Sequence, residues 1–208
     1  MSTHGPSLWE SLENRAPLLF LAAGVLSLVA GVNYGVTELF DSISFNSWVG
    51  LTVLLARVAS LLGVAGLSVR LRDRNARAGK VSRAVVALAA VCTAALLISA
   101  ILSNLGVDHP IQAVLGLGTV ALSLITYLFF GVAILHTDSH ATLVGALLLV
   151  AAVSLLFGMF GRVALPIGVV GTAAEGALFV THVAIGYRLM AEPESRDHAD
   201  LSPETVAE

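Results

Sequence analysis

The sequence predicts an all-α integral membrane protein, a bundle of six transmembrane helices, and three observations carry this prediction. The chain of 208 residues is 57% hydrophobic and only 12% charged, roughly half the charged fraction of a soluble domain. Its charges are bunched, and the apolar stretches between the bunches are about as long as the roughly 20 residues that a helix needs to cross a bilayer. The basic residues fall in connections that an even number of spans places on one side.

Each predicted span has a boundary signal at its start or end. Pro17 opens the first span, as proline can in a first helical turn, and Pro110 restarts the fourth. Arg162 and Pro166 separate the fifth span from the sixth, and the span count depends most on this short break. The predicted spans are 17–37, 47–69, 82–104, 110–135, 141–161 and 166–189.

Residues 1–16 are predicted to form a leader with a short helix at the membrane interface. Ser7 and Glu10 have the spacing of a capping box, and Trp9 is expected at the level of the lipid headgroups. The leader carries acidic residues as well as Arg15 and lacks the positive start of a signal peptide. We therefore interpret the first apolar run as a membrane span.

The positive charges predict the orientation of the chain. Nine basic residues fall on one side of the predicted bundle and only Arg162 on the other, so both termini are expected in the cytoplasm. Six of the nine lie between Arg70 and Arg83; they set the topology or attract anionic headgroups. The nine residues are Arg15, Arg70, Arg72, Arg74, Arg77, Lys80, Arg83, Arg188 and Arg196.

The last segment, residues 191–208, is acidic, contains two prolines and has little apolar content, so it is predicted to be a disordered cytoplasmic tail. Lys80 is the only lysine, the other basic residues being arginine, and the net charge is −3. This composition resembles that of uncharacterised small multi-pass membrane proteins of halophilic archaea, and high-GC bacteria give a similar profile. The resemblance carries no motif and implies no activity.

Small and polar residues recur at helical spacing and predict which helix faces point inward. Gly31 and Gly35 form a GxxxG motif, the spacing that lets two helices approach closely. The fourth span carries a longer stripe that we expect either to pack against another helix or to line a polar cavity. Its members are Gln112, Gly116, Thr119, Ser123 and Thr126.

Two opposite charges lie inside the predicted spans. Arg57 is about ten residues into the second span and Glu175 about nine into the sixth, which puts both roughly 14 Å below the same face at 1.5 Å per residue. An unpaired charge at that depth costs about 2.5–3.5 kcal/mol or more. We therefore predict an Arg57–Glu175 ion pair, which either fixes the helix register or forms part of a functional site.

His182 lies two turns beyond Glu175 on the same helix face and is the only histidine in the middle of a span. It is interpreted either as a proton relay or as a neutral side chain hydrogen-bonded to a hydroxyl, such as those of the fourth span. The segment from His136 to His140 is expected to be a solvated loop and not a metal site. Cys92 is expected to be a buried apolar residue.

The sequence contains no nucleotide-binding, metalloprotease or serine-hydrolase motif. A retinal protein is excluded because no lysine lies within a span. We expect no cofactor, no metal and no nucleic-acid partner. The favoured function is a non-enzymatic accessory, scaffold or sensor protein of the cell membrane, with a membrane protein or a second copy as partner. The alternative is a small transporter or proton-coupled carrier that uses Arg57, Glu175 and His182.

Overall fold

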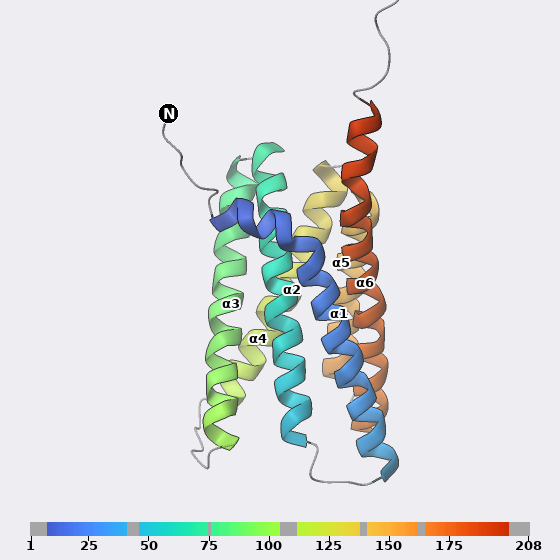
Figure 1. Ribbon diagram of the computed structural model, residues 1–208. Helices are drawn as coiled ribbons and strands as arrows, with labels where there is room; N and C mark the ends of the chain where they lie inside the picture. The colour runs from blue at the N-terminus through green and yellow to red at the C-terminus, as the bar shows by residue number, and fades with distance from the viewer. Residues whose placement is uncertain are drawn as a thin grey trace, which may run out of the picture.

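A computed structural model describes residues 8–40, 46–74, 76–104, 112–137, 141–161 and 165–199, and the rest of the chain lies outside the description. The described residues form six helices and the fold is all-α (Figure 1). All six are long and apolar enough to cross a membrane, so the chain is a multi-pass membrane protein. The helices are α1 (Leu8–Phe40), α2 (Asn46–Arg74), α3 (Ala76–Asn104), α4 (Gln112–Thr137), α5 (Thr142–Phe160) and α6 (Ile167–Ala199).

Large apolar side chains are exposed on every helix, which is the surface that a lipid-embedded bundle requires because lipid tails are as apolar as leucine. On α1 to α5 the most exposed of these side chains is between 39% and 67% exposed. On α6 it is Tyr187, which is 73% exposed. One residue from each helix illustrates the pattern: Leu18, Leu55, Val91, Val114, Val153 and Val180.

The sequence predicted a separate short helix in the leader, and this prediction is wrong: the described part of the leader is the first part of α1. This helix runs without a break from Leu8 to Phe40 with Pro17 inside it. Its first turns lie across the end of the bundle before the helix turns along the bundle axis (Figure 1), and a proline is a usual cause of such a bend. Trp9 stacks on the Arg83 guanidinium, whose central carbon lies 4.6 Å from the ring centre, so the leader is held against α3.

The last helix is longer than its predicted span. It continues to Ala199, into the segment that composition predicts to be disordered; residues 200–208 lie outside the described residues. A helix can extend beyond a bilayer because it satisfies its backbone hydrogen bonds internally.

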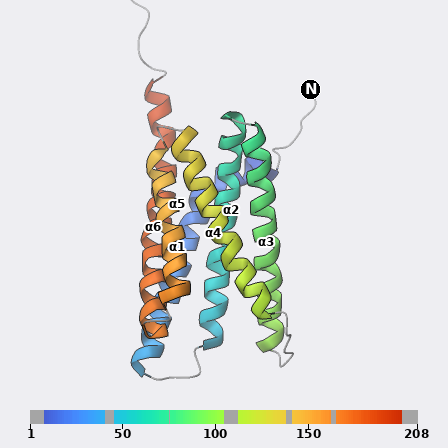
Figure 2. The same ribbon diagram turned by 180° about the vertical axis from the view of Figure 1, so that it is seen from behind.

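The start of α1, the junction of α2 and α3 and the end of α6 lie at one end of the bundle, which we call the terminal end (Figures 1 and 2). The last turns of α1, α3 and α5 lie at the opposite end. This is the parity that the sequence predicted for its basic residues. That the terminal end faces the cytoplasm stays a prediction.

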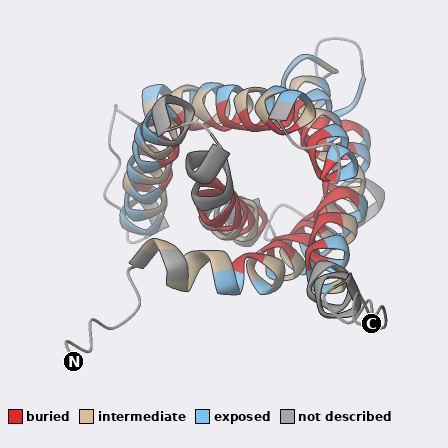
Figure 3. Ribbon diagram, turned by 90° about the horizontal axis from the view of Figure 1, so that it is seen from above, coloured by how far each residue is buried: buried red, intermediate tan, exposed pale blue. Residues whose placement is uncertain are grey.

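Each helix packs against the next one along the chain, and α6 returns to pack against α1. Seen along the bundle axis, α2 lies toward the middle (Figure 3). Its span is 56% buried, against 22–44% for the other five spans. The residues of α2 are therefore the ones placed to line any internal site.

The GxxxG motif packs as the sequence predicted. A Cβ added at Gly31 would lie 3.4 Å from the Cβ of Glu175, and one at Gly35 would lie 3.4 Å from Oγ1 of Thr172. The Thr172 hydroxyl donates a hydrogen bond of 3.2 Å to the carbonyl of Gly31. Close approach of α1 thus fixes the part of α6 that carries Glu175.

The main hydrophobic cluster lies in the half of the bundle nearest the terminal end. It includes the beginnings of α1, α3 and α5 and the second halves of α2, α4 and α6. Representative members are Phe20, Val64, Val86, Phe130, Leu148 and Ile185. The half toward the opposite end is built differently and contains the candidate site.

Candidate functional site

A cavity of about 850 Å³, partly open to the surroundings, lies between the helices and is lined by all six. Every lining residue belongs to the half of its helix that is nearer the opposite end. The cavity borders the hydrophobic cluster, and Leu155 and Leu178 belong to both. Small-molecule sites typically have volumes of about 300–1,000 Å³. Residues that line it from the six helices in turn are Tyr34, Arg57, Leu96, Ser123, Ser154 and Glu175.

The predicted intramembrane charges meet at the floor of this cavity. Nη2 of Arg57 donates a hydrogen bond to Oε1 of Glu175 across 2.6 Å. The two residues are only 6% and 4% exposed, so neither charge relies on bulk water. The structure thus brings together the pair that equal depth predicted, because α2 and α6 run in the same direction (Figure 1).

Each member of the pair uses only part of its hydrogen-bonding capacity. Nη1 of Arg57 and Oε2 of Glu175 are both buried and have no hydrogen-bond partner among the residues that the structure describes. A buried polar atom without a partner costs about 1–3 kcal/mol, and more when it belongs to a charged group. The floor therefore holds one donor and one acceptor that the described residues leave unsatisfied.

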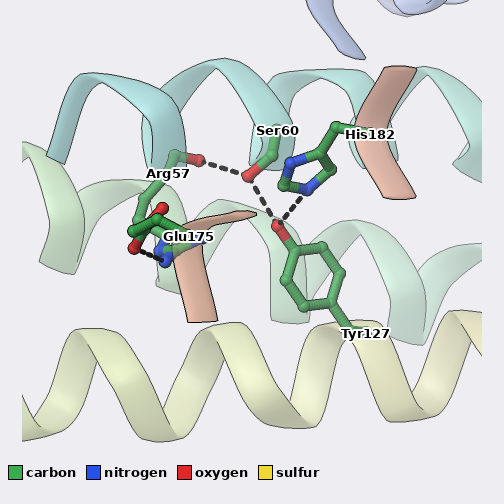
Figure 4. A network of polar contacts seen from close by, with 5 residues as sticks. All are labelled: Arg57, Ser60, Tyr127, Glu175 and His182. Carbon is green, nitrogen blue, oxygen red and sulfur yellow. Dashed lines mark hydrogen bonds and ion pairs between the residues drawn. The ribbon is translucent and has the colours of Figure 1, made fainter. Parts of the chain in front are cut away.

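A second group of polar side chains lies next to the ion pair, on the side of the terminal end (Figure 4). Tyr127 of α4 donates its hydroxyl hydrogen to Oγ of Ser60 at 2.6 Å. Ser60 in turn donates to the backbone carbonyl of Arg57 at 3.0 Å. The hydroxyl of Tyr127 is also 3.2 Å from Nε2 of His182, so one tyrosine joins α2, α4 and α6 immediately below the charges.

The hydrogen bonds of Tyr127 and Ser60 determine which ring nitrogen of His182 carries its hydrogen. Because the single hydrogen of Tyr127 goes to Ser60 and that of Ser60 goes to a carbonyl, His182 completes the chain as the donor from Nε2. Its other ring nitrogen, Nδ1, is buried without a partner among the described residues. The ring of Phe20 lies 6.0 Å away, centre to centre, on the side of the apolar cluster.

His182 therefore contacts a hydroxyl of the fourth helix, which is one of its two sequence-based interpretations. The other, a proton relay with Glu175, stays a prediction. Both residues lie on α6, but His182 is joined to the ion pair through Tyr127, Ser60 and the Arg57 backbone.

The polar stripe of α4 divides between the two expected roles. Thr119 and Ser123 line the cavity, and their hydroxyls are buried with no partner in the described part of the chain. Thr126 instead donates to the carbonyl of Leu122 within its own helix. Ser123 precedes Tyr127 by one turn, as Arg57 precedes Ser60, so the α4 hydroxyls and Arg57 face the cavity at similar depth.

An aromatic ring lines the cavity above Glu175. A Cβ added at Gly171 would lie 2.6–2.7 Å from three ring carbons of Tyr34, so only glycine leaves room for this ring. Gly171 precedes Glu175 by one helical turn. Tyr34 therefore forms the cavity wall one turn closer to the opposite end than the carboxylate.

Sequence reasoning missed the joint role of Ser60, Tyr127 and Tyr34, although Ser60 has a signal in its position three residues after Arg57. The structure finds no group of three potential metal ligands among the residues it describes. His136 is described, whereas Asp138 and His140 lie outside the description.

Comparison of this chain with protein-family models, curated proteins and solved structures found no match. The functional argument therefore depends on the geometry of the cavity and its floor.

Proposed function

We propose that the protein is a small-solute carrier of the cell membrane. The observation that carries this proposal is a cavity in one half of the bundle that ends on a half-satisfied buried ion pair. Carriers bind their substrates near the middle of the bilayer, inside a ring of helices. The distribution of basic residues predicts that the terminal end faces the cytoplasm, so the cavity faces outward in this conformation.

The packing beneath the floor supports the same proposal. Tyr127, His182 and the apolar cluster lie between the cavity and the terminal end, so the cavity is closed toward that side in this conformation. A carrier needs this asymmetry because a path open at both ends would be a channel.

An accessibility experiment tests the proposal without knowledge of the substrate. Cys92 is replaced by alanine, Ser123→Cys is introduced in the cavity wall, and a membrane-impermeant methanethiosulfonate is applied to right-side-out and inside-out vesicles. A carrier exposes this position to each side in turn, so we expect labelling from both sides, faster from the outside. Thr93→Cys is the matched control, because Thr93 is buried outside the cavity and should not be labelled.

Each outcome separates two functions. Labelling from the outside alone would contradict a carrier and support a sensor with a fixed pocket, within the function class that the sequence favoured. An absence of labelling from either side would contradict both and leave a structural role for the ion pair.

A further inference from the structure

The cavity that we propose for transport also indicates which class of substrate it takes. Arg57 keeps Nη1 as a buried, unpaired donor and Glu175 keeps Oε2 as a buried, unpaired acceptor among the described residues, and both belong to groups joined by a contact of 2.6 Å. A molecule that satisfies both atoms must carry an acceptor and a donor close together. Each satisfied group removes the cost of a buried, unpaired polar atom.

The charge of the floor restricts the substrate further. Because Arg57 and Glu175 neutralise each other, the site has no excess charge to balance an ion. A simple anion would face the Glu175 carboxylate and a simple cation the Arg57 guanidinium, each at a desolvation cost. A zwitterion meets both charges and leaves the site neutral.

The surroundings supply a second contact for each charge. The Thr119 and Ser123 hydroxyls have no partner in the described structure and can donate to a carboxylate bound at Arg57. On the other side, the ring of Tyr34 forms the wall one turn above Glu175. An aromatic face attracts an ammonium group, so the cavity is polarised along its floor.

Above the floor the walls are apolar, and they include Leu51, Leu54, Leu96, Val120 and Leu155. Burial of an apolar group against them contributes about 25 cal/mol for each Å² removed from water. A volume of about 850 Å³ is more than a glycine-sized molecule fills. We propose that the cavity binds a free amino acid with a large apolar side chain, its carboxylate at Arg57 and its ammonium group at Glu175. This inference rests on the proposed function, because it names the substrate of the same site.

The test measures binding to the purified full-length protein in detergent, by calorimetry and thermal shift. L-phenylalanine is compared with 3-phenylpropionate, which lacks the ammonium group, and 2-phenylethylamine, which lacks the carboxylate. A third analogue, N,N,N-trimethylphenylalanine, keeps both charges but has no N–H to donate to Oε2 of Glu175. We expect each analogue to bind at least tenfold more weakly than L-phenylalanine, and glycine likewise. Equal affinity for either singly charged analogue, or no binding of L-phenylalanine, would overturn the proposal.

Variants locate the site without breaking the ion pair. A Cβ added at Gly116 would meet no atom within 4 Å, and Gly116 lines the cavity, so Gly116→Leu should fill it and abolish binding. Gly118 has the same free space but does not line the cavity, so Gly118→Leu should bind normally. Ser123→Ala should weaken binding several-fold, whereas Thr93→Ala, outside the cavity, should not. Loss of binding in both leucine variants, or in neither, would overturn the assigned position.

The substrate class and the carrier function fail in different ways. If Ser123→Cys is labelled from both sides but L-phenylalanine neither binds nor slows the labelling, the substrate class is wrong and the carrier proposal stands. If L-phenylalanine binds and protects but labelling occurs from the outside only, the site is correct and the protein is a receptor.

Discussion

The two halves of the bundle are made from the same kinds of residue but pack differently. Near the terminal end, glycines bring backbones into contact: a Cβ at Gly66 would lie 2.6 Å from the carbonyl oxygen of Leu12, and one at Gly186 would lie 2.9 Å from that of Pro17. Near the opposite end, Gly50 and Gly116 line the cavity with no atom within 4 Å of an added Cβ. Glycine therefore closes the terminal half, whereas in the cavity half Gly50 and Gly116 leave space although Gly171 packs against Tyr34.

The polar groups differ between the halves in the same sense. At the middle of the bundle, Tyr127, Ser60 and His182 bond to one another and to the backbone. On the cavity side, Arg57 and Glu175 each keep an atom without a partner among the described residues. A membrane bundle gains no hydrophobic stabilisation from helix association, so an unfilled polar cavity costs stability. The ligand that we propose for this cavity would offset that cost, whereas the terminal half is stabilised by its own packing.

The largest loss of stability is expected from substitutions of Arg57 and Glu175, the ion pair at the floor of the cavity. Arg57→Gln and Glu175→Gln should each lower the free energy of unfolding in detergent by about 3 kcal/mol, because each leaves one buried charge without its partner. The double variant should recover part of the loss, because it removes both charges. Losses that simply add would show that the two side chains do not interact and would contradict an ion pair at the floor of the cavity.

The packing contrast is tested next on a single helix, α2. Gly66→Ala should lower the free energy of unfolding by about 1–3 kcal/mol, because the added carbon meets backbone that cannot move aside. Gly50→Ala is the matched control and should cause no loss, because its Cβ enters open space. Equal effects of the two substitutions in thermal denaturation would contradict the difference between the halves.

Substitution of Tyr127, which lies between the two halves, should cause an intermediate loss of stability. Tyr127→Phe keeps the buried ring but removes the hydroxyl that contacts Ser60 and His182, and should cost about 1–2 kcal/mol. Tyr187→Phe is the control, because Tyr187 is 73% exposed and should unfold as the parent does. Combining Tyr127→Phe with Ser60→Ala should cost less than the sum of the two, and strict additivity would contradict the network.

Hydrophobicity and charge placement were enough to predict the six helices, because a bilayer imposes length and apolarity on each span independently. Equal depth was enough to bring Arg57 and Glu175 together, since helix direction and rise per residue follow from the span order. Both are properties that a single segment carries in its own residues.

The cavity and its surroundings follow from contacts between segments, which a linear pattern does not contain. Thr119 and Thr126 belong to the same stripe, yet only Thr119 lines the cavity. Nothing in the sequence of α4 shows that Tyr127 would meet Ser60. The helix ends were misjudged for another reason: a proline bends α1 without ending it, and α6 continues past its apolar part.

The smallest predicted effect has the opposite sign and lies on α4, which crosses both halves. Gly116→Ala should raise the free energy of unfolding by about 0.5 kcal/mol, because alanine favours a helix over glycine and the added carbon enters the cavity without a clash. Gly131→Ala, on the same helix near the terminal end, should instead lower it, because its Cβ would lie 2.8 Å from a methyl group of Leu149 and 3.0 Å from the carbonyl of Gly145. Thermal unfolding in detergent measures both shifts side by side. If Gly116→Ala destabilises the protein as Gly131→Ala does, the space beside Gly116 is filled, which would contradict both the cavity and the substrate that we propose for it.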